Sequence, residues 1–169
     1  EGVAWSLGCA FFYVVVPGVL MRFVWRERLS SHGLTFRGYL PHLKWYLALF
    51  VPVGLLVLLV SLQPAFQEKY PFYKEVRGWQ DLLVWELFYG LQFVSLEFFF
   101  RGFMIHGTKA RLGIYSVMWM VPPYMMIHFG KPMLEATGAI IAGTILGFLS
   151  LRMGSVFGGA TIHILVAVS

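Results

Sequence analysis

Glu97 and Arg101 stand four residues apart inside a long apolar run, in the stretch VSLEFFFRG. Side chains four residues apart on a helix lie on one face, so this carboxylate and guanidinium can form an ion pair. His128, which ends the stretch YMMIH, and His163, in GGATIHILVA, also interrupt apolar runs. Placing an ionisable side chain inside a membrane costs at least ~2.5–3.5 kcal/mol, so each is a candidate functional residue.

Glu97, His128 and His163 together suit the hydrolysis of an amide bond. A carboxylate can take a proton from water and later deliver it to a leaving amine. An imidazole can donate a hydrogen bond to the oxyanion of a tetrahedral intermediate. The same three residues are also plausible ligands of a zinc ion with an open position for water, so the residue types leave the cofactor as none or zinc.

The overall composition indicates a polytopic membrane protein. Of the 169 residues, 59% are hydrophobic and only 12% are charged, whereas a soluble domain has about 25% charged residues. The formal charge of +5 comes from basic residues in short gaps between apolar runs. Such gaps are typical of membrane loops, so we expect contact with the lipid bilayer and exclude a nucleic-acid partner.

We therefore expect an all-α transmembrane helical bundle in a single membrane-embedded domain, 1–169. Because the chain begins with Glu1 and ends inside an apolar run, we interpret it as a fragment of a longer protein. The hydropathy pattern predicts at least six spans, of which the fourth and sixth are short for a bilayer and the fourth is interrupted by Pro122 and Pro123. The predicted spans cover roughly 2–24, 44–63, 79–106, 114–128, 133–151 and the residues from 155 onward.

The distribution of Lys and Arg over the gaps predicts the orientation in the membrane. The gaps after the first, third and fifth spans hold eight basic residues, against four in the gaps after the second and fourth. The basic side is expected to be cytoplasmic, which places residue 1 outside. The eight are Arg22, Arg26, Arg28, Arg37, Lys44, Lys109, Arg111 and Arg152; the four are Lys69, Lys74, Arg77 and Lys131.

The three candidate residues are predicted to lie at similar depths. Glu97 lies about 14 Å, His163 about 12 Å and His128 about 18 Å from the cytoplasmic ends of their spans, at 1.5 Å per helical residue. We expect them to meet in one cavity nearer the cytoplasmic side. Glu86 shares the helix face of Glu97 nearer the outer end, and the remaining histidines are expected at the water interface; they are His32, His42 and His106.

Three short motifs, in this order along the chain, resemble those of the CPBP family of CAAX proteases and bacteriocin-processing enzymes, also called the ABI family. The motifs are LEFFFRG, YMMIH and HILVA, and the resemblance covers about 79–169. The family pattern has two adjacent Glu, three spacers and Arg; then an aromatic residue, three spacers and His; then His, three spacers and Asn or Asp. Here Leu96 replaces the first Glu and Ala167 replaces the Asn or Asp.

The resemblance implies an intramembrane peptidase, glutamate- or metal-dependent, that cleaves a membrane-associated protein or peptide. Arg101 and Glu97 match the first motif, Tyr124 and His128 the second, and His163 the third. In this interpretation Glu97 is the general base, His128 and His163 stabilise the oxyanion, Arg101 supports the site and Tyr124 contributes to substrate binding. If a metal is present, the two histidines and Glu97 would bind it.

The implied roles are maturation, leader cleavage or C-terminal sorting-tag cleavage in the bacterial inner (plasma) membrane. The departures at Leu96 and Ala167 keep an alternative open: a catalytically inactive relative that binds peptides, acts as a scaffold or confers bacteriocin immunity. A second alternative is a proton-coupled transporter, because Glu and His side chains also relay protons across membranes.

Overall fold

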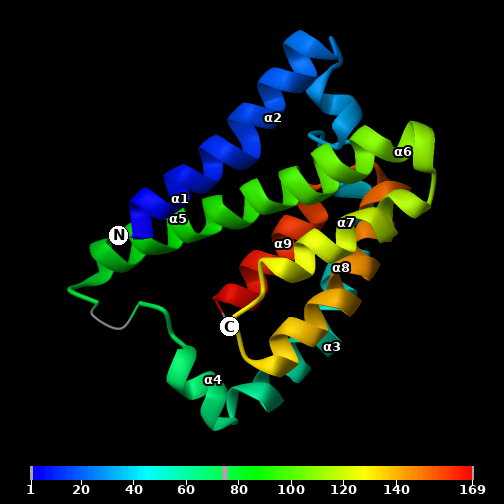
Figure 1. Cartoon of the computed structure of the whole chain (residues 1–169). Coiled ribbons are helices and arrows are strands. Elements are labelled where there is room, and N and C mark those ends of the chain that lie inside the picture. Colours follow the sequence, from blue (N-terminus) through cyan, green and yellow to red (C-terminus); the bar gives the residue numbers. More distant parts are fainter. Residues whose placement is uncertain (1, 74–75, 169) are drawn as a thin grey trace.

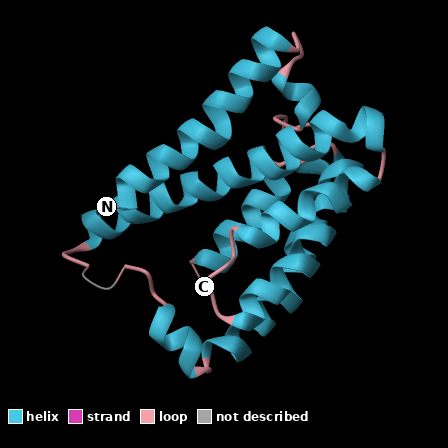
Figure 2. Cartoon of the chain, in the orientation of Figure 1, coloured by secondary structure: helices cyan, strands magenta, loops and turns pink. Residues whose placement is uncertain are grey.

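The structure is a computed structural model that describes residues 2–73 and 76–168, and over these residues it is a helical bundle without strands (Figures 1 and 2). The all-α prediction is therefore confirmed. Residues 1 and 74–75 lie outside the described residues, so the outer placement of the first residue and the contribution of Lys74 to the charge count stay predictions. The α-helices are α1 (Gly2–Ala10), α2 (Val16–Val19), α3 (Leu43–Ser61), α4 (Pro64–Lys69), α5 (Trp79–Glu97), α6 (Gly107–Leu112), α7 (Tyr115–Met126), α8 (Met133–Met153) and α9 (Phe157–Ala167).

Two of the long helices are continuous across several labelled segments. The first runs from α1 through the π-helical turns η1 (Phe11–Val15) and η2 (Leu20–Val24), with α2 between them. The other runs from α5 through η5 (Phe98–His106) into α6. π-Helical turns widen a helix locally and are frequent at functional sites, and η5 begins directly after Glu97.

The expected number of spans was too high. The described residues contain four helices that are long and apolar enough to cross a membrane: Gly2–Val24, Leu40–Ser61, Trp79–Leu112 and Met133–Met153. At 1.5 Å per residue, α7 with 12 residues and α9 with 11 are only about 18 and 17 Å long. Pro122 and Pro123 do not interrupt α7, which continues through both. The protein is an integral membrane protein in which two short helices pack among four spans.

The long helix α5–η5 organises the bundle. It packs along α1 on one side and against α9 and α7 on the other, while α3 packs against α9 and α7 against α8. One apolar cluster joins η5, α7 and α8, and a second joins α3, α8 and α9 through Tyr46, Leu146 and Ile162. α9 therefore lies between α5 and α3 (Figure 1).

Three connecting segments rich in basic residues meet at one end of the bundle. The charge pattern had assigned all three to the same side of the membrane. Ser155 Oγ donates to the carbonyl of Thr35 at 2.8 Å, and the backbone N–H of Val156 donates to Gly33 at 3.0 Å. Lys109 Nζ donates to the carbonyl of Ser31 at 3.2 Å. The gaps after the first, third and fifth spans are therefore neighbours in space.

The same end contains two histidines that were wrongly expected to face water. His32 and His106 are buried, with 1% and 4% of their surface exposed, and His42 is half-buried. His32 Nε2 contacts Glu27 Oε2 at 2.5 Å, and His106 Nε2 lies 3.2 Å from Ser150 Oγ. The reason is that the segment after the first span folds back onto η5 and covers both rings.

Candidate active site

Glu97 and Arg101 form a fully buried ion pair in the centre of the bundle. Glu97 is the last residue of α5 and Arg101 lies in η5, so the helix itself brings them together. Arg101 Nη1 lies 2.9 Å from Glu97 Oε1, and neither residue is exposed. The pairing expected from their spacing is present. Two charges this deep stay ionised only when each has a partner of opposite charge.

His163 of α9 joins this pair from the neighbouring helix. Its Nδ1 lies 2.9 Å from Glu97 Oε1, and its side chain is 18% exposed, against 1% for Glu97. A carboxylate oxygen can only accept, so Nδ1 is the nitrogen that carries a proton at this contact. The imidazole therefore lies between the buried carboxylate and the more open side of α9, where Phe93 stacks on it with ring centroids 5.6 Å apart.

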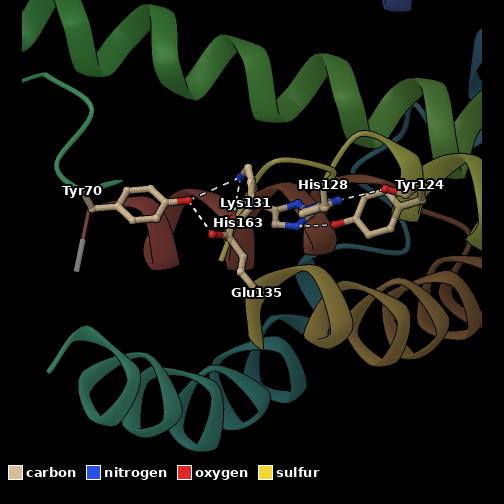
Figure 3. Close-up of polar contacts among 6 residues, drawn as sticks. All are labelled: Tyr70, Tyr124, His128, Lys131, Glu135 and His163. Carbon is tan, nitrogen blue, oxygen red and sulfur yellow. Dashed lines mark hydrogen bonds and ion pairs between the residues drawn. The ribbon is translucent and has the colours of Figure 1, made fainter. Parts of the chain in front are cut away.

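Tyr124 links the three groups to α7. Its hydroxyl lies 2.9 Å from His163 Nε2 (Figure 3), and the guanidinium carbon of Arg101 lies 4.3 Å from the centre of its ring. In a neutral imidazole with the proton on Nδ1, the Tyr124 hydroxyl donates to Nε2. Tyr124 is 2% exposed. It is thus a buried part of the site that positions His163 and Arg101.

His128 lies beside this group but does not join it directly. It follows the end of α7, and its Nδ1 lies 2.9 Å from the carbonyl of Tyr124, so Nδ1 donates there (Figure 3). Its ring centroid is 4.9 Å from that of Tyr124. The structure brings Glu97, Arg101 and His163 into contact, and it links His128 to them through Tyr124. The predicted depths in the membrane were similar for all these residues, so they could not show that His163 contacts Glu97 directly and His128 does not.

Within the part of the chain that the structure describes, no three His, Cys, Asp or Glu side chains are grouped so that they could hold a metal ion. Glu97 Oε1 and His163 Nδ1 face each other, and His128 Nδ1 faces a backbone carbonyl. In this arrangement Glu97 Oε1, His163 Nδ1 and His128 Nδ1 each face another protein group, and the remaining donor atoms of these residues do not converge on one point. The described residues therefore do not fit the zinc alternative.

Two consecutive glycines of α9 make the close packing around Glu97 possible. A Cβ atom on Gly159 would overlap Glu97 Oε2, and a Cβ atom on Gly158 would overlap the ring of Tyr46. The sequence indicated only that the small residues of this segment allow close helix approach. The sequence did not predict which groups would pack against these glycines. A carboxylate from α5 and an aromatic ring from α3 both pack directly against the backbone of α9.

The carboxylate retains one oxygen without a protein partner. Arg101 and His163 both approach Oε1 at ion-pair distance, whereas Oε2 faces Gly159; neither oxygen has a hydrogen bond of regular geometry among the described residues. A buried oxygen of this kind is an acceptor site for a proton or for a hydrogen-bond donor. The geometry thus combines a carboxylate that is paired with Arg101 and contacts His163 through Oε1 with a second oxygen, Oε2, that faces Gly159.

Residues 77–169, more than half of the chain, match the family described as type II CAAX prenyl endopeptidase Rce1-like. The chain belongs to this family. The Rce1-like family consists of intramembrane endopeptidases within the CPBP group, so the predicted relationship is confirmed. No curated protein and no solved structure matches the chain.

The two departures from the CPBP pattern lie in apolar surroundings in this Rce1-like chain. Leu96 is buried in the apolar cluster with Phe100 and Tyr124, on a different side of the helix from the ion pair. Ala167 lines a pocket of about 170 Å³ between α5 and α9, together with Phe93 and Ile164. At both positions the surroundings match the apolar residue present here.

Proposed function

We propose that this Rce1-like chain is an intramembrane endopeptidase in which Glu97 activates water for attack on a peptide bond. The observation that supports this most directly is the free Oε2 atom of a fully buried carboxylate whose Oε1 faces Arg101 and His163. The Arg101 guanidinium beside Oε1 offsets the charge of an ionised Glu97, and the ionised carboxylate is the form that accepts a proton. Three side chains from the sequence prediction meet at this point.

In the proposed reaction, Glu97 Oε2 takes one proton from water while the water oxygen forms a bond to the carbonyl carbon. The carbonyl oxygen becomes an oxyanion. Glu97 then returns the proton to the amide nitrogen as the carbon–nitrogen bond breaks, which leaves a carboxylic acid and an amine. This sequence needs no group beyond the side chain, water and the substrate.

The histidines stabilise charge in this proposal. His163 contacts Glu97 through Nδ1 and the Tyr124 hydroxyl through Nε2, so it is held beside the carboxylate. His128 donates from Nδ1 to a backbone carbonyl, so its Nε2 is the nitrogen available to a substrate. Because Nδ1 already donates, Nε2 can donate to the oxyanion only in the imidazolium form, which requires the uptake of a proton. Tyr124, for which a role in substrate binding stays a prediction, also positions His163 through the contact of its hydroxyl with Nε2.

The substrate in this proposal is a membrane-associated protein or peptide, which follows from membership of the Rce1-like family. We propose a bacterial maturation, leader-cleavage or C-terminal sorting-tag reaction in the inner membrane. The site would lie nearer the cytoplasmic side, because the basic gaps cluster at one end of the bundle.

The test uses the full chain purified into lipid vesicles with two reporter peptides, one carrying a prenylated C-terminal CAAX sequence and one a membrane-anchored C-terminal tag. We expect cleavage of at least one, and loss of that cleavage by more than 10³-fold in Glu97→Gln. The matched control is Glu86→Gln, on the same helix three turns earlier, which should retain activity. Equal cleavage by wild type and Glu97→Gln would overturn the proposal.

A second candidate, a catalytically inactive relative that binds peptides, is favoured by one observation. Leu96 and Ala167 both lie in apolar surroundings, so two polar groups of the CPBP pattern have no counterpart here. This candidate predicts that the reporter peptides bind to the vesicles without cleavage, and that Glu97→Gln leaves the binding affinity unchanged.

A further inference from the structure

A tyrosine from outside the matched family region reaches the site. Tyr46 lies in the first turn of α3, whereas the family match begins at residue 77. It is 1% exposed and packs in the apolar cluster with Leu146 and Ile162. Its ring lies against Gly158, where a Cβ atom would overlap it. The position of this side chain depends on the close approach of α3 and α9.

The hydroxyl of Tyr46 has no hydrogen-bond partner among the described residues, although it is buried. Buried hydroxyls in proteins are nearly always hydrogen-bonded, because leaving one without a partner destabilises the fold. Nearby Tyr39 follows that rule, since its hydroxyl lies 2.9 Å from Thr161 Oγ1. A phenylalanine would fill the space of Tyr46 without this penalty, so the hydroxyl itself requires an explanation.

The ring that carries the unpartnered hydroxyl and the carboxylate oxygen Oε2 lie against consecutive residues of α9. The Tyr46 ring carbon that bears the hydroxyl lies against Gly158, and Glu97 Oε2 lies against Gly159. The Cα atoms of these consecutive glycines are only about 3.8 Å apart. A phenol is a donor and a carboxylate is an acceptor, and each has free capacity toward the same region.

We propose that Tyr46 is a further catalytic residue, whose hydroxyl donates a hydrogen bond to the oxyanion formed when water on Glu97 Oε2 attacks the peptide bond. This inference rests on the proposed peptidase function. A reacting carbonyl must lie about 3 Å from both the activated water and the oxyanion donor. Tyr46 and Glu97 reach neighbouring positions of α9 from two different helices, and a substrate carbonyl would enter between them. The Tyr46 hydroxyl would add a polar group to a site in which Leu96 and Ala167 replace the two polar residues of the CPBP pattern.

The test compares Tyr46→Phe with wild type in the vesicle cleavage assay. Loss of one oxyanion donor lowers kcat by about 10²–10³-fold, and we expect this loss with an unchanged KM. Because the substitution removes an unpartnered buried hydroxyl, the thermal unfolding midpoint should stay the same or rise. Tyr39→Phe is the matched control: it breaks the hydrogen bond to Thr161 and should lower the midpoint while leaving kcat unchanged.

Glu97→Gln, measured in parallel, separates the two proposals. If Glu97→Gln is inactive and Tyr46→Phe cleaves at the wild-type rate, the role of Tyr46 is overturned and the peptidase proposal stands. A Tyr46→Phe variant that loses kcat together with its unfolding midpoint would show a packing role, which also overturns the inference. Wild-type cleavage by Glu97→Gln would overturn both proposals.

Discussion

At the scale of single residues, the site depends on one buried carboxylate and the groups around it. Glu97 and Arg101 have no exposed surface, so their ionised forms depend on each other and on His163. Removing one member of a buried ion pair leaves an uncompensated charge, which is more destabilising than replacing both members. This asymmetry allows the effect of Arg101 on stability to be measured separately from the proposed chemical role of Glu97.

Arg101→Met should therefore lower the free energy of unfolding by about 3–5 kcal/mol. The double variant Glu97→Gln/Arg101→Met should recover part of that loss, because no charge of the pair remains buried. The measurement is a double-mutant cycle by unfolding in mixed detergent micelles, with an expected coupling of about 2–3 kcal/mol. Strictly additive single effects would contradict the pairing.

Tyr124→Phe isolates the hydrogen bond to His163. The ring stays above Arg101, but the donor to Nε2 is lost. We expect cleavage to slow by about tenfold, equivalent to the ~1.4 kcal/mol of one hydrogen bond, with little change in stability. Tyr124→Leu is the comparison variant and should also destabilise the fold, since it removes the ring. Wild-type cleavage by Tyr124→Phe would show that the hydroxyl does not position His163.

At the scale of helices, α9 determines the geometry although it is too short to cross a membrane. Its two glycines form a surface on which α3 and α5 both rest, and its histidine, four residues beyond Gly159, faces the carboxylate. Short helices with small residues approach their neighbours closely, because backbone meets side chain directly. The separation of Glu97 from α9 is therefore set by the absence of a Cβ atom.

Gly159→Ala should displace the Glu97 carboxylate and reduce cleavage to near background, with a loss of stability of a few kcal/mol from overpacking. Gly138→Ala is the matched control on α8, where a Cβ atom would meet nothing within 4 Å. That variant should retain activity and be slightly more stable, since alanine favours a helix by up to about 1 kcal/mol. The assays are peptide cleavage and thermal unfolding; retained activity in Gly159→Ala would be inconsistent with the contact.

The sequence predicted some of these elements and not others for identifiable reasons. The Glu97–Arg101 pair followed from i, i+4 spacing, which depends on one helix only. The position of His163 near Glu97 was predicted from its sequence motif together with its depth in the membrane. Depth also suggested a direct meeting with His128, but depth does not specify which way a side chain points around its helix. Tyr46 and the glycine surface arise from contacts between α3, α5 and α9, and no local pattern encodes those contacts.

At the scale of the whole molecule, the basic gaps gather at one end and the outer connections at the other. At the second end, Tyr70 donates to Glu135 Oε2 at 2.6 Å, and Lys131 Nζ lies 2.5 Å from Glu135 Oε1 (Figure 3). This ties the connection after α3 to the turn between α7 and α8. The burial of His32 and His106 was not predictable from hydropathy, because it results from a connecting segment folding back onto the bundle.

The orientation predicted from the basic gaps can be tested with single cysteines. In a Cys9→Ala background, Ser31→Cys should react with a membrane-impermeant thiol reagent from the cytoplasmic side, and Gln67→Cys from the opposite side. Both positions are exposed and lie at opposite ends of the bundle. The control is labelling after the membrane is permeabilised, when both should react. The reverse pattern would place the basic end outside and contradict the positive-inside assignment.

The complete enclosure of Glu97 has a consequence for the rate of turnover. Neither a scissile bond nor a water molecule can contact Oε2 until a neighbouring group moves aside. The imidazole of His163 is the most accessible member of the site, and Phe93 covers it. In the proposed reaction, α9 must therefore move relative to α5 before water reaches Oε2, and a conformational step of this kind can limit the turnover of an enzyme.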